Sequence, residues 1–322
     1  MKRHRKSLNH VHWVGRFGNR MFQVAYGKMF EKAFNVDFRV TSEWEGDTLF
    51  KNCKSKLILN KKLREELVNY GREISGHTHE KWIEITKKYD NSMEYMFPYD
   101  LGSWKKPKSN LWFDCACWDS EYIFSQYNKK DLKKLFEFSD EVKQSDVFKR
   151  AEDKQGTYDV AHLRRDDIVF SDISHNWNYP VISRRSYEKA FLMFDFDTRK
   201  MEWISDDFPS NPSLGWTYPE GQLPCDGIFF DFLPDFLKLY FARNIFSANS
   251  SFSWWASLLS PTATVYSPIL HKRVIYSENK KELDCEFIQS NTPHFMHVLG
   301  YSFGEEHAME GFHGCPFINI KD

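Results

Sequence analysis

The second half of the chain alternates between two apolar periodicities, and this alternation constrains the fold more than any other feature. Short runs rich in β-branched and aromatic residues, typical of strands, are separated by segments whose apolar residues recur at helical spacing. In order these are the strand YDVAHLR, the helix SRRSYEKAFLMF, the strand KMEWIS, the helix FDFLPDFLKLYFA, the strand NIFSAN, the helix FSWWASLLS and the strand ATVYS, all between residues 158 and 267. Strands alternating with helices predict a parallel sheet in an α/β fold.

The first residues show the same pattern once. LNHVHWVG reads as a strand, the glycine turn GRFGN (Gly15 to Asn19) follows, and a helical segment then leads to the strand VDFRV. Glycine permits backbone angles and close approaches that other residues resist. A chain of 322 residues is more often two domains than one. We therefore expect two Rossmann-like domains with a cleft between them, residues 1–155 and 156–322, with an unassigned tail after about residue 267.

Composition argues against two classes of partner. Lys and Arg number 44 against 45 Asp and Glu, so the chain lacks the overall positive charge that nucleic-acid binders use. No window approaches eighteen apolar residues, and the basic start MKRHRKSLNHVHW has no apolar run behind it, so neither a membrane span nor a signal peptide is expected. We expect a cytoplasmic protein, or alternatively a Golgi or ER lumenal one whose anchor is absent from this sequence. The oligomeric state is left open.

Polar clusters follow three of the predicted strands, at the carboxyl ends where open parallel sheets bind ligands. The first is HLRRDD, in which the guanidinium groups of Arg164 and Arg165 match phosphate oxygens and Asp167 could orient one of them. The alternative is a solvated arginine pair neutralised by Asp166 and Asp167.

The second and third clusters, each considered alone, also allow both a ligand-binding and a purely structural interpretation. Asn249, Ser250, Ser251 and Ser253 lie between a strand and a helix, where free N–H groups and hydroxyls suit an anion, although serine N-caps are common. Asp206 and Asp207 could accept hydrogen bonds from a base or a ribose, bind a divalent metal, or be solvated. A diphosphate-bearing ligand is the interpretation that uses all three clusters. Gly15 and Gly18 would face the same cleft from the other domain.

Four segments resemble motifs of the α-1,2-fucosyltransferase family, between residue 15 and about residue 260. GRFGNRMFQVAYG is similar to its Gly-x-Gly-Asn-Gln-Met-Phe-Gln segment, CWDSEYIF to its Gln-Ser-Glu-x-Tyr-Phe stretch, and HLRRDD to its His-x-Arg-Arg-Gly-Asp motif. ISDD followed by SANSSFSWWASLL resembles its Ser-Asp-Asp and Ser-x-Ser-x-Phe-Ser-Trp-Trp pair. The chain departs at Arg20, where the family usually has Gln, and at Asp166, where it usually has Gly.

The resemblance implies a GT-B-like glycosyltransferase that transfers L-fucose from GDP-fucose to a glycan hydroxyl, in α-1,2 linkage, with inversion and without an obligatory metal or other cofactor. It implies that Arg164 and Arg165 contact the diphosphate and that His162 and one of Asp206 or Asp207 lie toward the nucleoside. Arg164, Asp172 and Asn19 are the catalytic candidates, with Asp172 the base by analogy. The implied donor site also includes Asp167, Asn249, Ser250, Ser251, Phe252, Ser253, Gly15 and Gly18.

Two alternatives remain beside this hypothesis. The enzyme could transfer another GDP-linked sugar, or use a protein as acceptor. The chain could also be a catalytically silent sugar- or nucleotide-binding protein, with the aromatic segment Leu111 to Phe124 as a sugar platform.

Overall fold

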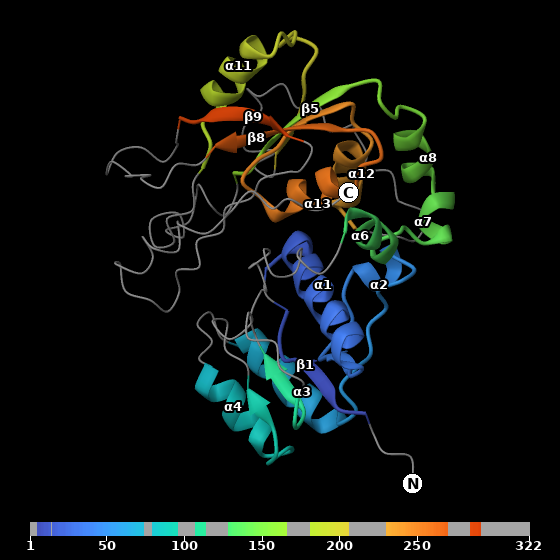
Figure 1. The fold of residues 1–322 in the computed structure, drawn as a ribbon, viewed down its shortest axis with the longest axis vertical. Coiled ribbons are helices and arrows are strands. Elements are labelled where there is room, and N and C mark those ends of the chain that lie inside the picture. Colours follow the sequence, from blue (N-terminus) through green and yellow to red (C-terminus); the bar gives the residue numbers. More distant parts are fainter. Residues whose placement is uncertain are drawn as a thin grey trace. The chain divides into compact units, whose positions relative to one another are not determined.

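The computed structural model describes residues 5–13, 15–73, 79–95, 107–113, 128–165, 181–205, 230–269 and 284–290 (Figure 1). The chain divides into two units, Met1–Asp140 and Glu141–Asn319. Each unit contains a sheet of wholly or mainly parallel strands with helices, which confirms the predicted α/β class. The division falls before the expected boundary at residue 155, because Phe148 packs edge-on against Phe241 of the second unit, with ring centroids 5.2 Å apart.

The first unit is built on a four-stranded sheet in the order β2-β1-β4-β3, with all three pairings parallel. Helices cover both faces: α1 packs Tyr26 against Phe113, whereas α3 and α4 enclose Trp112 on the other side. Its elements are β1 (Ser7–His10), α1 (Phe17–Phe34), β2 (Asp37–Val40), α2 (Gly46–Leu49), α3 (Lys61–Glu73), α4 (His79–Lys87), β3 (Glu94–Tyr95), β4 (Leu111–Phe113) and α6 (Lys129–Leu135).

The glycine turn is shorter than the sequence predicts. Helix α1 already begins at Phe17, so Gly18 and Asn19 belong to its first turn. Gly15 has a φ of +71°, a left-handed conformation in which a side chain would be strained. Gly15 is therefore the residue that lets the chain pass from the end of β1 into α1.

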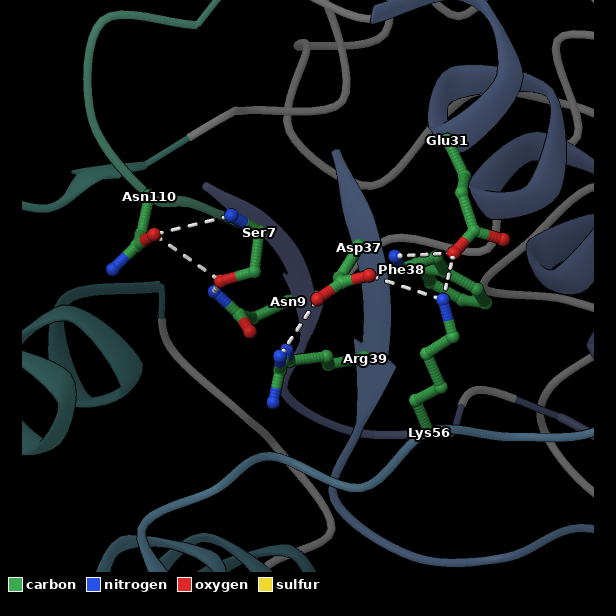
Figure 2. A network of polar contacts seen from close by, with 8 residues as sticks. All are labelled: Ser7, Asn9, Glu31, Asp37, Phe38, Arg39, Lys56 and Asn110. Atoms are coloured by element: carbon green, nitrogen blue, oxygen red, sulfur yellow. Dashed lines mark hydrogen bonds and ion pairs between the residues drawn. The ribbon is translucent and has the colours of Figure 1, made fainter. Parts of the chain in front are cut away.

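A polar network lies at the amino ends of β1 and β2 (Figure 2). The Lys56 Nζ atom is 2.5 Å from Glu31 Oε1 and 3.0 Å from Asp37 Oδ1, and Arg39 pairs with Asp37 at 2.8 Å. Ligands bind parallel sheets at the opposite, carboxyl ends of the strands. This network therefore holds the sheet together and is not a candidate site.

The Lys56 network should make the first unit sensitive to acid. Burial by itself raises the pKa of the Glu31 and Asp37 carboxyls, but the bonds and charges of Lys56 and of Lys28 or Arg39 outweigh it, so both pKa values lie below their ordinary range. A folded-state pKa below the unfolded one stabilises the protein above the ordinary value of about 4, and this contribution is lost as pH falls through the folded-state pKa.

We expect Lys56→Met to lower the free energy of unfolding at neutral pH, and the difference from wild type to shrink toward pH 3, as measured by urea denaturation. Lys54→Met, a change at a nearby exposed lysine, is the control and should show little difference at any pH. A difference between wild type and Lys56→Met that stayed constant with pH would contradict this account.

The second unit contains a five-stranded sheet in the order β6-β5-β7-β8-β9. The first four strands are parallel, as predicted, but β9 is antiparallel to β8 and falls in the tail that the sequence left unassigned. The elements are α7 (Asp140–Gln144), α8 (Asp146–Glu152), β5 (Asp159–Leu163), α11 (Arg184–Met193), β6 (Glu202–Ser205), α12 (Leu233–Tyr240), β7 (Asn244–Phe246), α13 (Ser251–Leu259), β8 (Thr264–Ile269) and β9 (Glu286–Ser290).

Helices also cover both faces of this sheet. On one face α11 packs Tyr187, Ala190 and Phe191 against a cluster that includes Leu163, Phe246 and residues of β8 and β9. On the other face His162 of β5 contacts Phe252 of α13, with ring centroids 5.9 Å apart. No helix among the described residues is long and apolar enough to span a bilayer.

Candidate functional site

The strand order of the second unit creates a point at its carboxyl edge where successive connections diverge. The chain leaves β5 through α11 to β6 on one side, and α12 then returns it to β7 on the other side of β5. Connections that leave adjacent strands in opposite directions open a crevice, which is where doubly wound sheets bind ligands. Two of the three predicted polar clusters flank this point, at the ends of β5 and β7.

His162 lies at the end of β5 and is buried. Burial, followed by the positive charges of Arg164 and Arg165, lowers the pKa of its imidazole to about 3, so the ring is neutral at physiological pH. Its Nδ1 atom has no hydrogen-bond partner among the described residues. An unsatisfied buried polar atom costs about 1 to 3 kcal/mol, which a ligand's donor or acceptor would recover.

The two consecutive arginines lie in different environments. Arg165 is buried, and its Nη1 atom donates to the carbonyl of Ile182 at 2.8 Å, which holds the segment before α11 against the end of β5. Arg164 is partly exposed. The sequence predicts the same phosphate-binding role for both arginines. In the structure, Arg165 also makes a contact within the protein that anchors the segment before α11.

The second cluster forms the start of α13. The Ser250 hydroxyl caps the helix by accepting from the N–H of Phe252 at 3.3 Å, so the alternative of serine capping is correct for this residue. Ser253 is fully buried and donates to the carbonyl of Ala248 at 3.3 Å. Ser253 thus shapes the turn, and its hydroxyl does not face solvent.

The helix terminus can still attract an anion, because the dipole of α13 is positive at this end even where Ser250 caps the N–H of Phe252. Ser251 and Phe252 are partly exposed at this end, and Asn249 is buried just before it. His162 and the first turn of α13 are brought together by the contact between His162 and Phe252.

Several predicted residues lie outside the described part of the chain. They are Asp166, Asp167 and Asp172 after the arginine pair, and Asp206 and Asp207 after β6. Ser205, the last residue of β6, pairs with Leu163, so β5 and β6 end at the same level of the sheet. Among the described residues, no group of three or more His, Cys, Asp or Glu side chains could hold a metal ion.

The glycine turn of the first unit is braced by Arg20. Its Nε atom donates to the carbonyl of Gly15 at 3.1 Å, and its Nη1 atom pairs with Glu45 at 2.6 Å. The residue that departs from the family motif therefore fixes the turn. A Cβ atom on Gly15 would lie 2.0 Å from Asn19 Nδ2. Gly15 and Asn19 are therefore in close contact, and a side chain at position 15 would clash with Asn19.

The aromatic segment begins as a buried strand. Leu111, Trp112 and Phe113 form β4, and all three are buried. They belong to the core of the first unit, so the predicted sugar platform is wrong for these three residues. Residues 114 to 124 lie outside the described part of the chain.

The sequence matches no family model, and no curated protein matches it significantly. Among solved structures, the chain is similar to NodZ α-1,6-fucosyltransferase soaked with GDP-fucose, with 10% identity, a TM-score of 0.45, and coverage of 89% of this chain and 99% of that one. A mutant of FUT1 from Arabidopsis thaliana in complex with GDP gives 12% identity, a TM-score of 0.46, and coverage of 93% and 77%. NodZ from Bradyrhizobium gives 11%, 0.44, and coverage of 89% and 99%. Similarity this distant does not distinguish one activity from another.

Sequence reasoning missed one residue at the site, Tyr187 of α11. Its hydroxyl donates to the carbonyl of His162 at 2.7 Å. In the sequence Tyr187 forms part of an apolar helical stripe with Ala190 and Phe191, which predicts only a core position. Nothing in that spacing indicates where the hydroxyl points.

Proposed function

We propose that the chain is an inverting glycosyltransferase that moves L-fucose from GDP-fucose to a hydroxyl of a glycan acceptor, in α-1,2 linkage. The observation that carries the proposal is the buried His162, whose Nδ1 atom has no partner among the described residues, at the switch point of a doubly wound sheet. A neutral imidazole there offers a hydrogen bond to a nucleoside. The four motif resemblances in the sequence supply the choice of donor.

The diphosphate would lie between Arg164 and the start of α13. Departure of GDP leaves additional negative charge on the diphosphate, and groups that bind this charge more strongly in the transition state lower the barrier. Arg164 supplies a guanidinium with forked donors, and the start of α13, where the Ser250 hydroxyl already caps the N–H of Phe252, supplies the positive end of a helix dipole. No step of this mechanism is assigned to a metal.

The remaining roles are proposed from position in the sequence. Asp206 or Asp207 would accept hydrogen bonds from the nucleoside, Asp167 would orient an arginine, and Asp172 would deprotonate the acceptor hydroxyl. From their motif resemblance, Gly15 and Gly18 are proposed as donor-site residues and Asn19 as a catalytic residue. Arg165 would contribute positive charge while anchoring the segment before α11.

The proposal is tested by calorimetry with GDP, GDP-fucose, GDP-mannose and UDP-glucose, followed by transfer assays on a panel of glycans. We expect GDP and GDP-fucose to bind and GDP-fucose to be consumed, with activity unchanged by EDTA. Loss of activity in EDTA and recovery with a divalent ion would assign Asp206 and Asp207 to a metal.

Other results of these binding and transfer assays would favour the alternative functions. Turnover of a different GDP-sugar would correct the donor, and linkage analysis of the product would correct the α-1,2 assignment. Binding of GDP-fucose without hydrolysis or transfer across the panel would indicate a non-catalytic binding protein. A chain that bound none of these nucleotides would contradict the proposal altogether.

A further inference from the structure

Tyr187 lies under the switch point and touches both strands that border it. It is fully buried in α11, and its hydroxyl is 2.7 Å from the carbonyl oxygen of His162 and 3.5 Å from that of Ser247. His162 belongs to the end of β5, and Ser247 is the first residue after β7. The shorter distance marks His162 as the main acceptor and Ser247 as the weaker one.

The two acceptors are the first residues beyond the shared ladder. The last paired residues of β5 and β7 are Ala161 and Phe246, so His162 and Ser247 stand where the strands begin to separate. A single hydroxyl that contacts both carbonyls sets the distance between the ends of β5 and β7. Burial raises the pKa of Tyr187, so the hydroxyl remains a protonated donor at physiological pH.

Each strand end carries one half of the candidate site. From His162 the chain continues to Arg164 two residues later, and from Ser247 it continues to the cap of α13 at Ser250. Small displacements of the supporting backbone weaken a site whose groups must converge on one ligand. The spacing of the two halves therefore depends on the contact beneath them.

We propose that Tyr187 is a positioning residue that sets the separation of the β5 and β7 ends and thereby the geometry of the diphosphate-binding crevice. The inference rests on the proposed function for the identity of the ligand. The tyrosine ring packs against Trp203 and Phe287, with centroids 5.8 and 4.8 Å away, contacts that a phenylalanine would keep. The effect of removing the hydroxyl alone therefore distinguishes a positioning role of Tyr187 from a role in core packing.

A matched pair of variants separates these two roles. Tyr158 donates its hydroxyl to the carbonyl of Lys238, also at 2.7 Å, from a position just before β5 at the amino end of the same sheet. Tyr187→Phe and Tyr158→Phe thus remove the same kind of bond at opposite ends of one strand. Both should lower Tm by a similar few degrees, with unchanged circular dichroism.

We expect Tyr187→Phe to raise the Kd for GDP about tenfold and Tyr158→Phe to leave it within about twofold. We also expect faster hydrogen exchange of the backbone amides of residues 247–253 in Tyr187→Phe alone, without nucleotide. Equal GDP affinity in Tyr187→Phe and wild type, or an equal loss in Tyr158→Phe, would overturn the inference. A wild-type protein that fails to bind GDP refutes the proposed function, while the exchange experiment still decides whether Tyr187 holds the strand ends.

Discussion

Replacing Arg164 with alanine should reduce turnover of GDP-fucose on the order of a hundredfold, about 2.7 kcal/mol of transition-state stabilisation. The side chain lies at the carboxyl end of β5, where it is partly exposed, and the neighbouring Arg165 is occupied by the carbonyl of Ile182. We propose Arg164 as the arginine that meets the departing diphosphate, because it is the more exposed of the two. Its loss removes charge that is needed most when the bond to the sugar breaks.

The measurement is kcat with saturating donor, together with Kd for GDP and circular dichroism to confirm folding. Arg164→Lys keeps the charge but loses the forked geometry, so it should recover only part of the rate. Arg199→Ala is the matched control, because Arg199 is 88% exposed, pairs with Asp197, and precedes the amino end of β6. Normal transfer by Arg164→Ala would refute the leaving-group role.

Phe246→Ala should destabilise the second unit by about 3 to 5 kcal/mol, as for other fully buried aromatic side chains. The Phe246 ring stacks on Tyr266 with centroids 4.5 Å apart and meets Phe191 and Phe196 edge-on at 4.7 and 5.1 Å. Truncation would leave a cavity at the junction of β7, β8 and α11, where the dense aromatic packing cannot easily collapse.

Urea denaturation followed by tryptophan fluorescence gives the change in the free energy of unfolding, and Tm should fall by on the order of 10 °C. Leu192→Ala tests the specificity of the effect, because Leu192 is an apolar residue of α11 that is 74% exposed. This second change should alter stability by no more than about 0.5 kcal/mol. Similar stabilities of Phe246→Ala and wild type would mean that the cluster is not the centre of the core.

The alternation of apolar periods was sufficient to predict most of the second unit. The strands at His162 and Phe246 and the helices at Tyr187 and Trp254 all lie where the pattern places them, because each buries side chains on one face or the other of the same sheet. The pattern failed for β9, because Phe287 is buried while the neighbouring Ile288 is exposed, so the segment EFIQS shows no apolar alternation.

The candidate site was predictable to the level of segments and not of individual side chains. The sequence placed the polar clusters at strand ends, since a parallel sheet brings its carboxyl ends together. It could not separate Arg164 from Arg165, or the capping hydroxyl of Ser250 from the buried one of Ser253, because these differences come from contacts with Ile182, Phe252 and Ala248.

The late strand β9 affects how this unit can fold. Asp284, just before it, bonds to the Ser183 cap of α11, and the N–H of Cys285 donates to Ser186 at 2.9 Å, contacts that span 101 and 99 residues of sequence. Closing loops of this length costs chain entropy before any contact repays it, and slows folding. The start of α11, which Arg165 holds against β5, can therefore be fully secured only after residue 285 has left the ribosome. During synthesis, the second unit completes the edge that carries the candidate site among its last steps.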